Sequence, residues 1–203
     1  LHALHIKNLS KSYGDRRLFT HLNLDVQAGQ KVLIKGPSGC GKSTLFRLIT
    51  GEEIADEGEI IGVTTVNECT SSFVSSIGII SQHPFLFNDT VRYNLTLGQE
   101  FSEEELLAVL KQVKLDFELT GGMDFIIKNN GENISGGQRV RIELARFLLR
   151  RKNLLLADEV TANLDKENAF MVHELLFSLP VMMLEIAHHI DDESRYQDRK
   201  SVV

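Results

Sequence analysis

Apolar and polar residues alternate at the start of the chain and then give way to more continuous apolar runs. Residues 3–9 and 18–27 alternate as half-exposed antiparallel strands do, and YGDRR at 13–17 predicts the turn between them. The run QKVLIKG at 30–36 predicts a buried strand, and the glycine-rich stretch after it leads into helical spacing over 43–50. We therefore expect an antiparallel β lobe followed by a strand, a loop and a helix.

Later apolar runs predict the rest of a sheet and the helices that accompany it. Short, nearly continuous apolar runs at 76–81, 153–158 and 181–187 are typical of strands covered on both faces of a parallel sheet. Three further segments carry apolar residues at helical spacing: 102–115, 136–151 and 166–179. The first of them opens with Ser102 and three acidic residues, which is a helix-start signature.

Composition limits the classes of protein that this chain can be. The 203 residues, 42% of them hydrophobic, suit a single domain over 1–203 with its own core. A net charge of −6 argues against nucleic acid as a partner, because such binding depends on clustered Lys and Arg. Cys40 and Cys69 form no disulfide or metal motif, and no run reaches the roughly 18 to 20 apolar residues of a membrane span.

The motif GPSGCGKST at 36–44 lies between a predicted strand and a predicted helix, which is the context of a phosphate-binding P-loop. Its glycines let backbone N–H groups converge on phosphate at a helix N-terminus, and Lys42 adds a full charge at the β- and γ-phosphates. The Ser43 hydroxyl suits a Mg²⁺ ion and Thr44 an α-phosphate. The alternative is a plain glycine turn. The expected nucleotide contacts are Gly36, Pro37, Ser38, Gly39, Cys40, Gly41, Lys42, Ser43 and Thr44.

The segment NLLLADE at 153–159 supplies acids at the end of a buried strand. Asp158 is placed to join the Mg²⁺ shell, and Glu159 is suited to polarise the attacking water. Alone, the pair could be two solvated acids. Together with the loop at 36–44 it predicts ATP hydrolysis on an α/β fold: a P-loop NTPase core with a mostly parallel sheet, an N-terminal antiparallel β lobe and an inserted α-helical lobe. We assign 1–82 and 152–190 to the β lobe and core, about 83–151 to the helical lobe, and 190–203 to a short C-terminus.

The segment ISGGQ at 134–138 begins another helix, so it offers a hydroxyl and free N–H groups to a second phosphate. It resembles the signature of the ATP-binding cassette (ABC) family. The resemblance implies that ATP is held between the P-loop of one domain and the signature of a second domain in a head-to-tail pair. The signature residues are Ser135, Gly136, Gly137 and Gln138.

Other family motifs occur in the family's order. Gln82 resembles the Q-loop glutamine, a Mg²⁺ and water contact, and Asp165 resembles the D-loop residue at the dimer interface. His188 resembles the switch histidine at the γ-phosphate, with His189 as the neighbouring candidate. Tyr13 resembles the aromatic residue that stacks on adenine, for which a flat ring is suited.

The segment HPFLFNDTVRYNL at 83–95 is similar to exporter-type domains, whose partners are transmembrane domains at the cytoplasmic face of a membrane. The resemblance implies an ATPase that drives export, with ATP and Mg²⁺ bound. Beyond His189 the chain is shorter and more polar than is usual in the family. Two alternatives remain at this point: a soluble ABC ATPase of translation or DNA repair, and a P-loop kinase.

Overall fold

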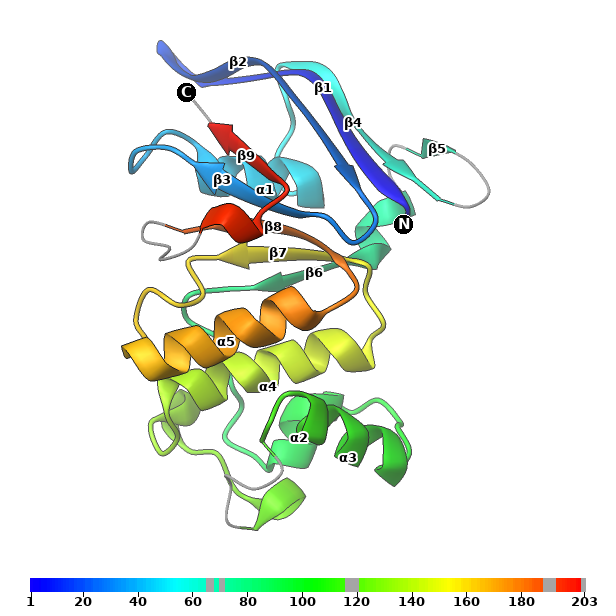
Figure 1. Cartoon of the computed structure of the whole chain (residues 1–203), viewed down its shortest axis with the longest axis vertical. Helices are drawn as coiled ribbons and strands as arrows, with labels where there is room; N and C mark the ends of the chain where they lie inside the picture. Colours follow the sequence, from blue (N-terminus) through cyan, green and yellow to red (C-terminus); the bar gives the residue numbers. More distant parts are fainter. Residues whose placement is uncertain (65–67, 70–71, 116–120, 188–192, 202–203) are drawn as a thin grey trace. The chain divides into compact units, whose positions relative to one another are not determined.

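The computed structural model describes residues 1–64, 68–69, 72–115, 121–187 and 193–201. They form two compact units (Figure 1). The first unit consists of Leu1–Ile79, Lys152–Glu159 and Leu179–Val203, and the second of Ile80–Arg151 and Val160–Ser178.

The first unit contains a four-stranded sheet in the order β2-β1-β4-β5. Its strands are β1 (Ala3–Tyr13), β2 (Arg16–Gln27), β4 (Glu57–Val63) and β5 (Glu68–Cys69). β1 pairs antiparallel with both β2 and β4, which confirms the antiparallel pairing expected at the start of the chain. β1 runs on to Tyr13, so the turn is shorter than expected and Gly14, at φ 56°, lies in it.

A five-stranded sheet has the order β6-β7-β8-β3-β9. Its strands are β6 (Ile77–Ile80), β7 (Leu154–Asp158), β8 (Met182–Ile186), β3 (Lys31–Lys35) and β9 (Asp198–Ser201). The pairs β7–β8, β8–β3 and β3–β9 are parallel, which confirms the α/β class. The polar sequence DRKS did not predict β9, and a polar strand is tolerated at the edge of a sheet.

A single cluster of buried apolar side chains joins the two sheets of the first unit to the helix α1 (Lys42–Thr50). Ile6 and Val26 come from the antiparallel sheet, Val32 and Leu184 from the other sheet, and Leu45 from α1. Because these side chains are at most 1% exposed, the strand β3 and the helix that follows it are fixed by the same packing. Two short 3₁₀ turns, η1 (Ser72–Ser76) and η4 (Glu193–Arg195), complete this unit.

The second unit is helical. Its α-helices are α2 (Val91–Thr96), α3 (Glu103–Gln112), α4 (Gly136–Leu149) and α5 (Lys166–Ser178), with 3₁₀ turns η2 (Gly122–Asp124) and η3 (Asn129–Gly131). Ser102 caps α3 and forms a reciprocal capping box with Glu105, as the serine and the acids after it predicted. α4 and α5 lie side by side in Figure 1.

Asn94 of α2 is fully buried and holds the chain before that helix. Its Oδ1 accepts hydrogen bonds from the Phe87 N–H at 2.8 Å and from the Arg146 guanidinium at 2.9 Å. Its amide nitrogen donates to the carbonyls of Phe87 and Thr90, both at 3.0 Å. The side chain therefore satisfies its own polar atoms and those of three neighbours in a place that water does not reach.

We expect Asn94→Ala to lower the free energy of unfolding by about 2 to 3 kcal/mol, because its buried partners would lose their hydrogen bonds. Urea titration followed by circular dichroism measures the change. Gln99→Ala, on the exposed segment after α2, is the control and should change stability by less than about 0.5 kcal/mol. An equal effect of the two substitutions would contradict this role for Asn94.

Candidate functional site

The turn between β3 and α1 requires glycine at its last position. Gly41, immediately before the helix, has φ 108°, where a side chain is strained. A Cβ there would also lie 3.1 Å from the Leu18 Cβ, closer than ordinary packing allows. Among the described residues no side chain caps this end of α1, so the first N–H groups of the helix remain available to an anion.

Lys42 lies across this turn. It is only 6% exposed, and its ammonium donates to the carbonyls of Gly36 at 2.8 Å and Pro37 at 3.0 Å. These bonds stabilise a buried charge that would otherwise be costly. They also place a full positive charge beside the free N–H groups at the start of α1.

A hollow of about 330 Å³ opens at this turn, entirely within the first unit. It is lined by Tyr13, Arg16, Leu18, Ser38, Gly39, Gly41, Lys42, Ser43, Thr44 and Glu159. The structure thus brings the exposed ring of Tyr13 and the acid Glu159 to the same cavity as the turn. Gly36 and Pro37 contact Lys42 instead, and half-buried Cys40 packs against the apolar cluster.

Arg16 and Leu18 line the hollow although the sequence did not single them out. The Arg16 guanidinium donates to the Gly39 carbonyl at 2.7 Å, so the start of β2 is tied to the turn. The sequence signal for Arg16 was its place as one of the two basic residues of YGDRR. Their sequence alone could not show which of them reaches a turn more than twenty positions away.

The two acids at the end of β7 differ in their backbones. Asp158 is the last residue of the strand, and the Glu159 N–H donates to the Ile186 carbonyl at 2.8 Å. Glu159 has φ 51°, a left-handed conformation that costs a residue with a Cβ about 1 to 2 kcal/mol. Such strain is retained where it serves a site, and here it accompanies a carboxylate that lines the hollow.

In the second unit, α4 begins with a complete capping box. The Ser135 hydroxyl accepts the Gln138 N–H at 3.1 Å, and the Gln138 side chain accepts the Ser135 N–H at 2.8 Å. As the first two residues of the helix, Gly136 and Gly137 have N–H groups without an acceptor inside it. The start of α4 is therefore a second place in the chain that suits an anion.

The start of α5 lies against these glycines. A Cβ on Gly137 would lie 2.4 Å from Oδ1 of Asn168, and one on Gly136 would lie 2.8 Å from Cδ2 of Leu164. Asn168 also donates from its backbone and side chain to Asp165, at 2.9 and 2.7 Å. These two bonds lower the pKa of Asp165 from its usual value, the backbone N–H contributing most.

Gln82 is half-buried and follows Ser81, whose N–H donates to Oε2 of Glu143 at 3.1 Å. Glu143 lies on α4, and the sequence analysis did not select it. Burial raises the pKa of Glu143 to about 7, against the opposing attraction of Arg146. The residue next to Gln82 is thus hydrogen-bonded to α4, the helix that Ser135 caps. His188 and His189 lie outside the described residues.

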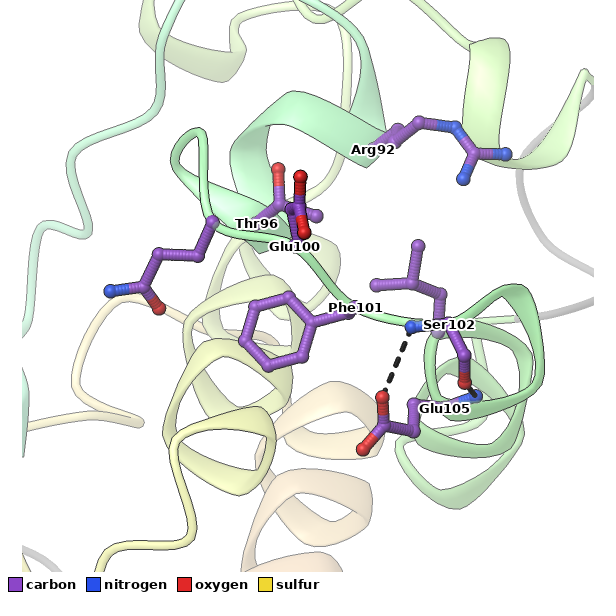
Figure 2. Close-up of a pocket in the computed structure, with 8 residues that line it drawn as sticks. Arg92, Thr96, Glu100, Phe101, Ser102 and Glu105 are labelled. Carbon is purple, nitrogen blue, oxygen red and sulfur yellow. Dashed lines mark hydrogen bonds between the residues drawn. The ribbon is translucent and has the colours of Figure 1, made fainter.

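The second unit has a larger hollow of about 570 Å³, shown in Figure 2. Its lining includes Arg92, Phe101 and the capping pair Ser102 and Glu105. Arg92 pairs with Glu103, and the capping bonds occupy Ser102. None of the site residues expected from the sequence lines this hollow, and we assign it no role.

We expect the Glu143→Gln variant to gain stability over the natural protein as pH rises. A carboxyl whose folded pKa is raised to about 7 contributes stability below its ordinary value of 4.5 and loses that contribution as pH passes 7. Urea titrations at about pH 5 and pH 8 should therefore show a difference between the two proteins that grows with pH. The exposed Glu104→Gln is the control. A pH-independent difference would contradict the burial of this charge.

Comparisons with known proteins agree on one family. The family model described as ABC transporter matches residues 19–162. The ATP-dependent lipid A-core flippase of Francisella tularensis subsp. holarctica (strain OSU18) is 39% identical over 194 residues, which are 91% of this chain and 32% of that protein. An ABC transporter ATP-binding protein of Bacillus subtilis (strain 168) is 35% identical over 193 residues, with 91% and 34% covered.

A bacterial Atm1-family ABC exporter, solved with ATP bound, has a similar structure. Its TM-score is 0.84 at 29% identity, and the match covers 100% of this chain and 37% of the exporter. The chain spans about a third of the length of the curated relatives it matches.

Proposed function

The chain belongs to the ABC transporter family, as an exporter-like ATP-binding domain, and on this premise we propose that it hydrolyses ATP at the hollow around Lys42. The observation that carries the proposal is the lining of that hollow. Three of its lining residues are Tyr13 with its aromatic ring, Lys42 with its buried ammonium, and Glu159, an acid with a left-handed backbone. They suit the base, the phosphates and the attacking water of one nucleotide.

We assign the phosphates to the turn at 36–44. The N–H groups at the start of α1 and the Lys42 ammonium bind the β- and γ-phosphates, and Thr44 contacts the α-phosphate. The ring of Tyr13 stacks on adenine. Arg16, which already donates to the Gly39 carbonyl, adds a second positive charge to this cavity.

The site suits Mg²⁺ because it offers hard oxygen donors. The Ser43 hydroxyl lines the hollow, and Asp158 is the neighbour of Glu159, which also lines it. We propose that Ser43 and Asp158 hold the ion, and the part of Gln82 stays a prediction from the family resemblance. Bound there, Mg²⁺ supplies charge neutralisation on the β- and γ-phosphate oxygens.

Glu159 is the proposed general base. Its carboxylate takes a proton from water while the water oxygen bonds to the γ-phosphorus, and the bond from that phosphorus to the bridging β–γ oxygen breaks. The products are ADP and phosphate. His188 is proposed to contact the γ-phosphate from the segment that follows β8.

The start of α4 supports a dimer with a second ABC ATPase domain. One chain offers two anion sites, the turn before α1 and the capped start of α4. We propose that Ser135, Gly136, Gly137 and Gln138 serve the nucleotide of the partner domain, with Asp165 at the interface. ATP then holds the two domains head to tail.

Exposed aromatic residues support a transmembrane partner. Phe85 and Phe87 are 60% and 41% exposed, and Phe87 stacks edge-on against both Phe85 and Tyr93. A rigid aromatic patch of this kind is typical of a binding surface. None of the described helices is both long and apolar enough to span a bilayer. We propose that the patch meets transmembrane domains at the cytoplasmic face of a membrane and that ATP hydrolysis drives export through them.

We expect Glu159→Gln to slow ATP hydrolysis by at least about a hundredfold, because an amide cannot accept the proton from water. ATP affinity should stay within about threefold, since the substitution keeps the shape of the side chain. Phosphate release measures the turnover, and a calorimetric titration of ATP measures the affinity. On gel filtration with ATP, the variant should accumulate as a dimer.

Glu104→Gln, on the exposed first turn of α3, is the matched control and should hydrolyse ATP normally. Unchanged turnover in Glu159→Gln would exclude Glu159 as the base. A variant that stops turnover but stays monomeric with ATP would contradict the head-to-tail pair.

A further inference from the structure

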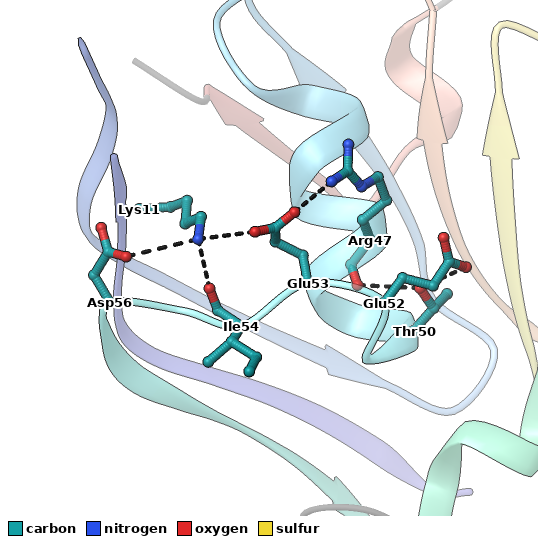
Figure 3. Close-up of polar contacts among 7 residues, drawn as sticks. All are labelled: Lys11, Arg47, Thr50, Glu52, Glu53, Ile54 and Asp56. Atoms are coloured by element: carbon teal, nitrogen blue, oxygen red, sulfur yellow. Dashed lines mark hydrogen bonds and ion pairs between the residues drawn. The ribbon is translucent and has the colours of Figure 1, made fainter. Parts of the chain in front are cut away.

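Lys11 is a nearly buried lysine beside Tyr13, which lines the candidate nucleotide hollow. It lies on β1 two residues before Tyr13, and the pairing of β1 with β2 is irregular between Lys11 and Ser12. It is 7% exposed, and its ammonium donates to the Ile54 carbonyl at 2.7 Å. Figure 3 shows this ammonium surrounded by the carboxylates of Glu53 and Asp56, at 3.0 and 3.6 Å.

The same ammonium lies over the ring of Tyr13, 5.1 Å from its centroid, within the range of a cation–π contact. Lys11, and after it Tyr13, also lower the pKa of Glu53 from its usual value. Lys11 thus contacts the ring at one face. Tyr13 remains 44% exposed and lines the hollow, so the other face of its ring is left for a flat partner.

Glu53 also connects this contact to the helix that follows the phosphate turn. Its second carboxylate oxygen pairs with Arg47 in the last turn of α1. α1 begins at Lys42, so the cluster joins the ring of Tyr13 to the helix whose other end faces the proposed phosphates. Side chains rather than the backbone make this connection. The Glu53 carboxylate forms an ion pair with Lys11 on one side and with Arg47 on the other.

We propose that Lys11 and Glu53 are positioning residues for the base of ATP: they hold the Tyr13 ring at a fixed place relative to α1, so that base and phosphates are bound together. The inference rests on the proposed function, because it takes the hollow to be the nucleotide site. Neither Lys11 nor Glu53 is proposed to contact ATP itself. Because they act through the Tyr13 ring, their substitution should weaken the binding only of ligands that carry a nucleotide base.

The test compares ATP with tripolyphosphate, which has the phosphates without the base, by isothermal titration of the purified full-length protein. We expect Lys11→Met to weaken ATP binding by about 3- to 10-fold, the worth of an aromatic stacking contact. Binding of tripolyphosphate and the turnover rate at saturating ATP should be unchanged, so the loss appears in KM. Lys11→Arg, which keeps a cation over the ring, should restore most of the ATP affinity.

Two further variants separate positioning from a general structural role. Lys7→Met makes the same change at an exposed position of the same strand and should bind both ligands normally. In a Tyr13→Leu background, Lys11→Met should weaken ATP binding no further, because the ring through which it acts is gone.

Equal ATP affinity of Lys11→Met and the natural protein would overturn the inference. So would an equal loss for ATP and tripolyphosphate, or a further loss in the Tyr13→Leu background. All three results leave the nucleotide site itself in place. A natural protein that binds neither ligand would overturn the proposed function and the inference with it.

Discussion

The ammonium of Lys42 and the two carbonyls that it binds set the shape of the turn on which the candidate site depends. A charge that is almost fully buried must find acceptors, and Gly36 and Pro37 supply them at 2.8 and 3.0 Å. The turn curves around this charge because Gly41 accepts φ 108° and leaves Leu18 room to pack. The free N–H groups at the start of α1 and a fixed positive charge consequently occupy one place, which a phosphate chain suits.

In the first unit, the aromatic residue Tyr13 and the acid Glu159 line the same hollow as that turn. In the second unit, the start of α4 is a separate place that suits an anion. Lys11 and Glu53 connect the Tyr13 ring to α1, and Glu159, which has a left-handed backbone, lines the same hollow. At the start of α4, the glycines leave space for Asn168 while Ser135 caps the helix. The described residues therefore include two helix starts of different construction that suit an anion, as the proposed pairing of two domains requires.

The sequence predicted what local chemistry determines. The turn at 36–44, the cap at Ser102 and the start of a helix at ISGGQ could all be predicted, because each depends on residues within a few positions of one another. The sequence could not predict contacts between distant segments: Lys11 meets Glu53 more than forty positions away, and Arg16 reaches Gly39. It also missed β9, whose polar residues carry no strand pattern, and the left-handed backbone of Glu159, because glutamate has no preference for it.

The most direct test of the central claim is a calorimetric titration of ATP with Mg²⁺ into the natural protein and into Lys42→Met, which keeps the apolar stem and removes the charge. The account predicts that the natural protein binds ATP and that the variant binds it at least about tenfold more weakly, because a charge-assisted bond to phosphate is lost. Equal affinity of the two proteins, with both folded, would contradict a nucleotide site organised around Lys42.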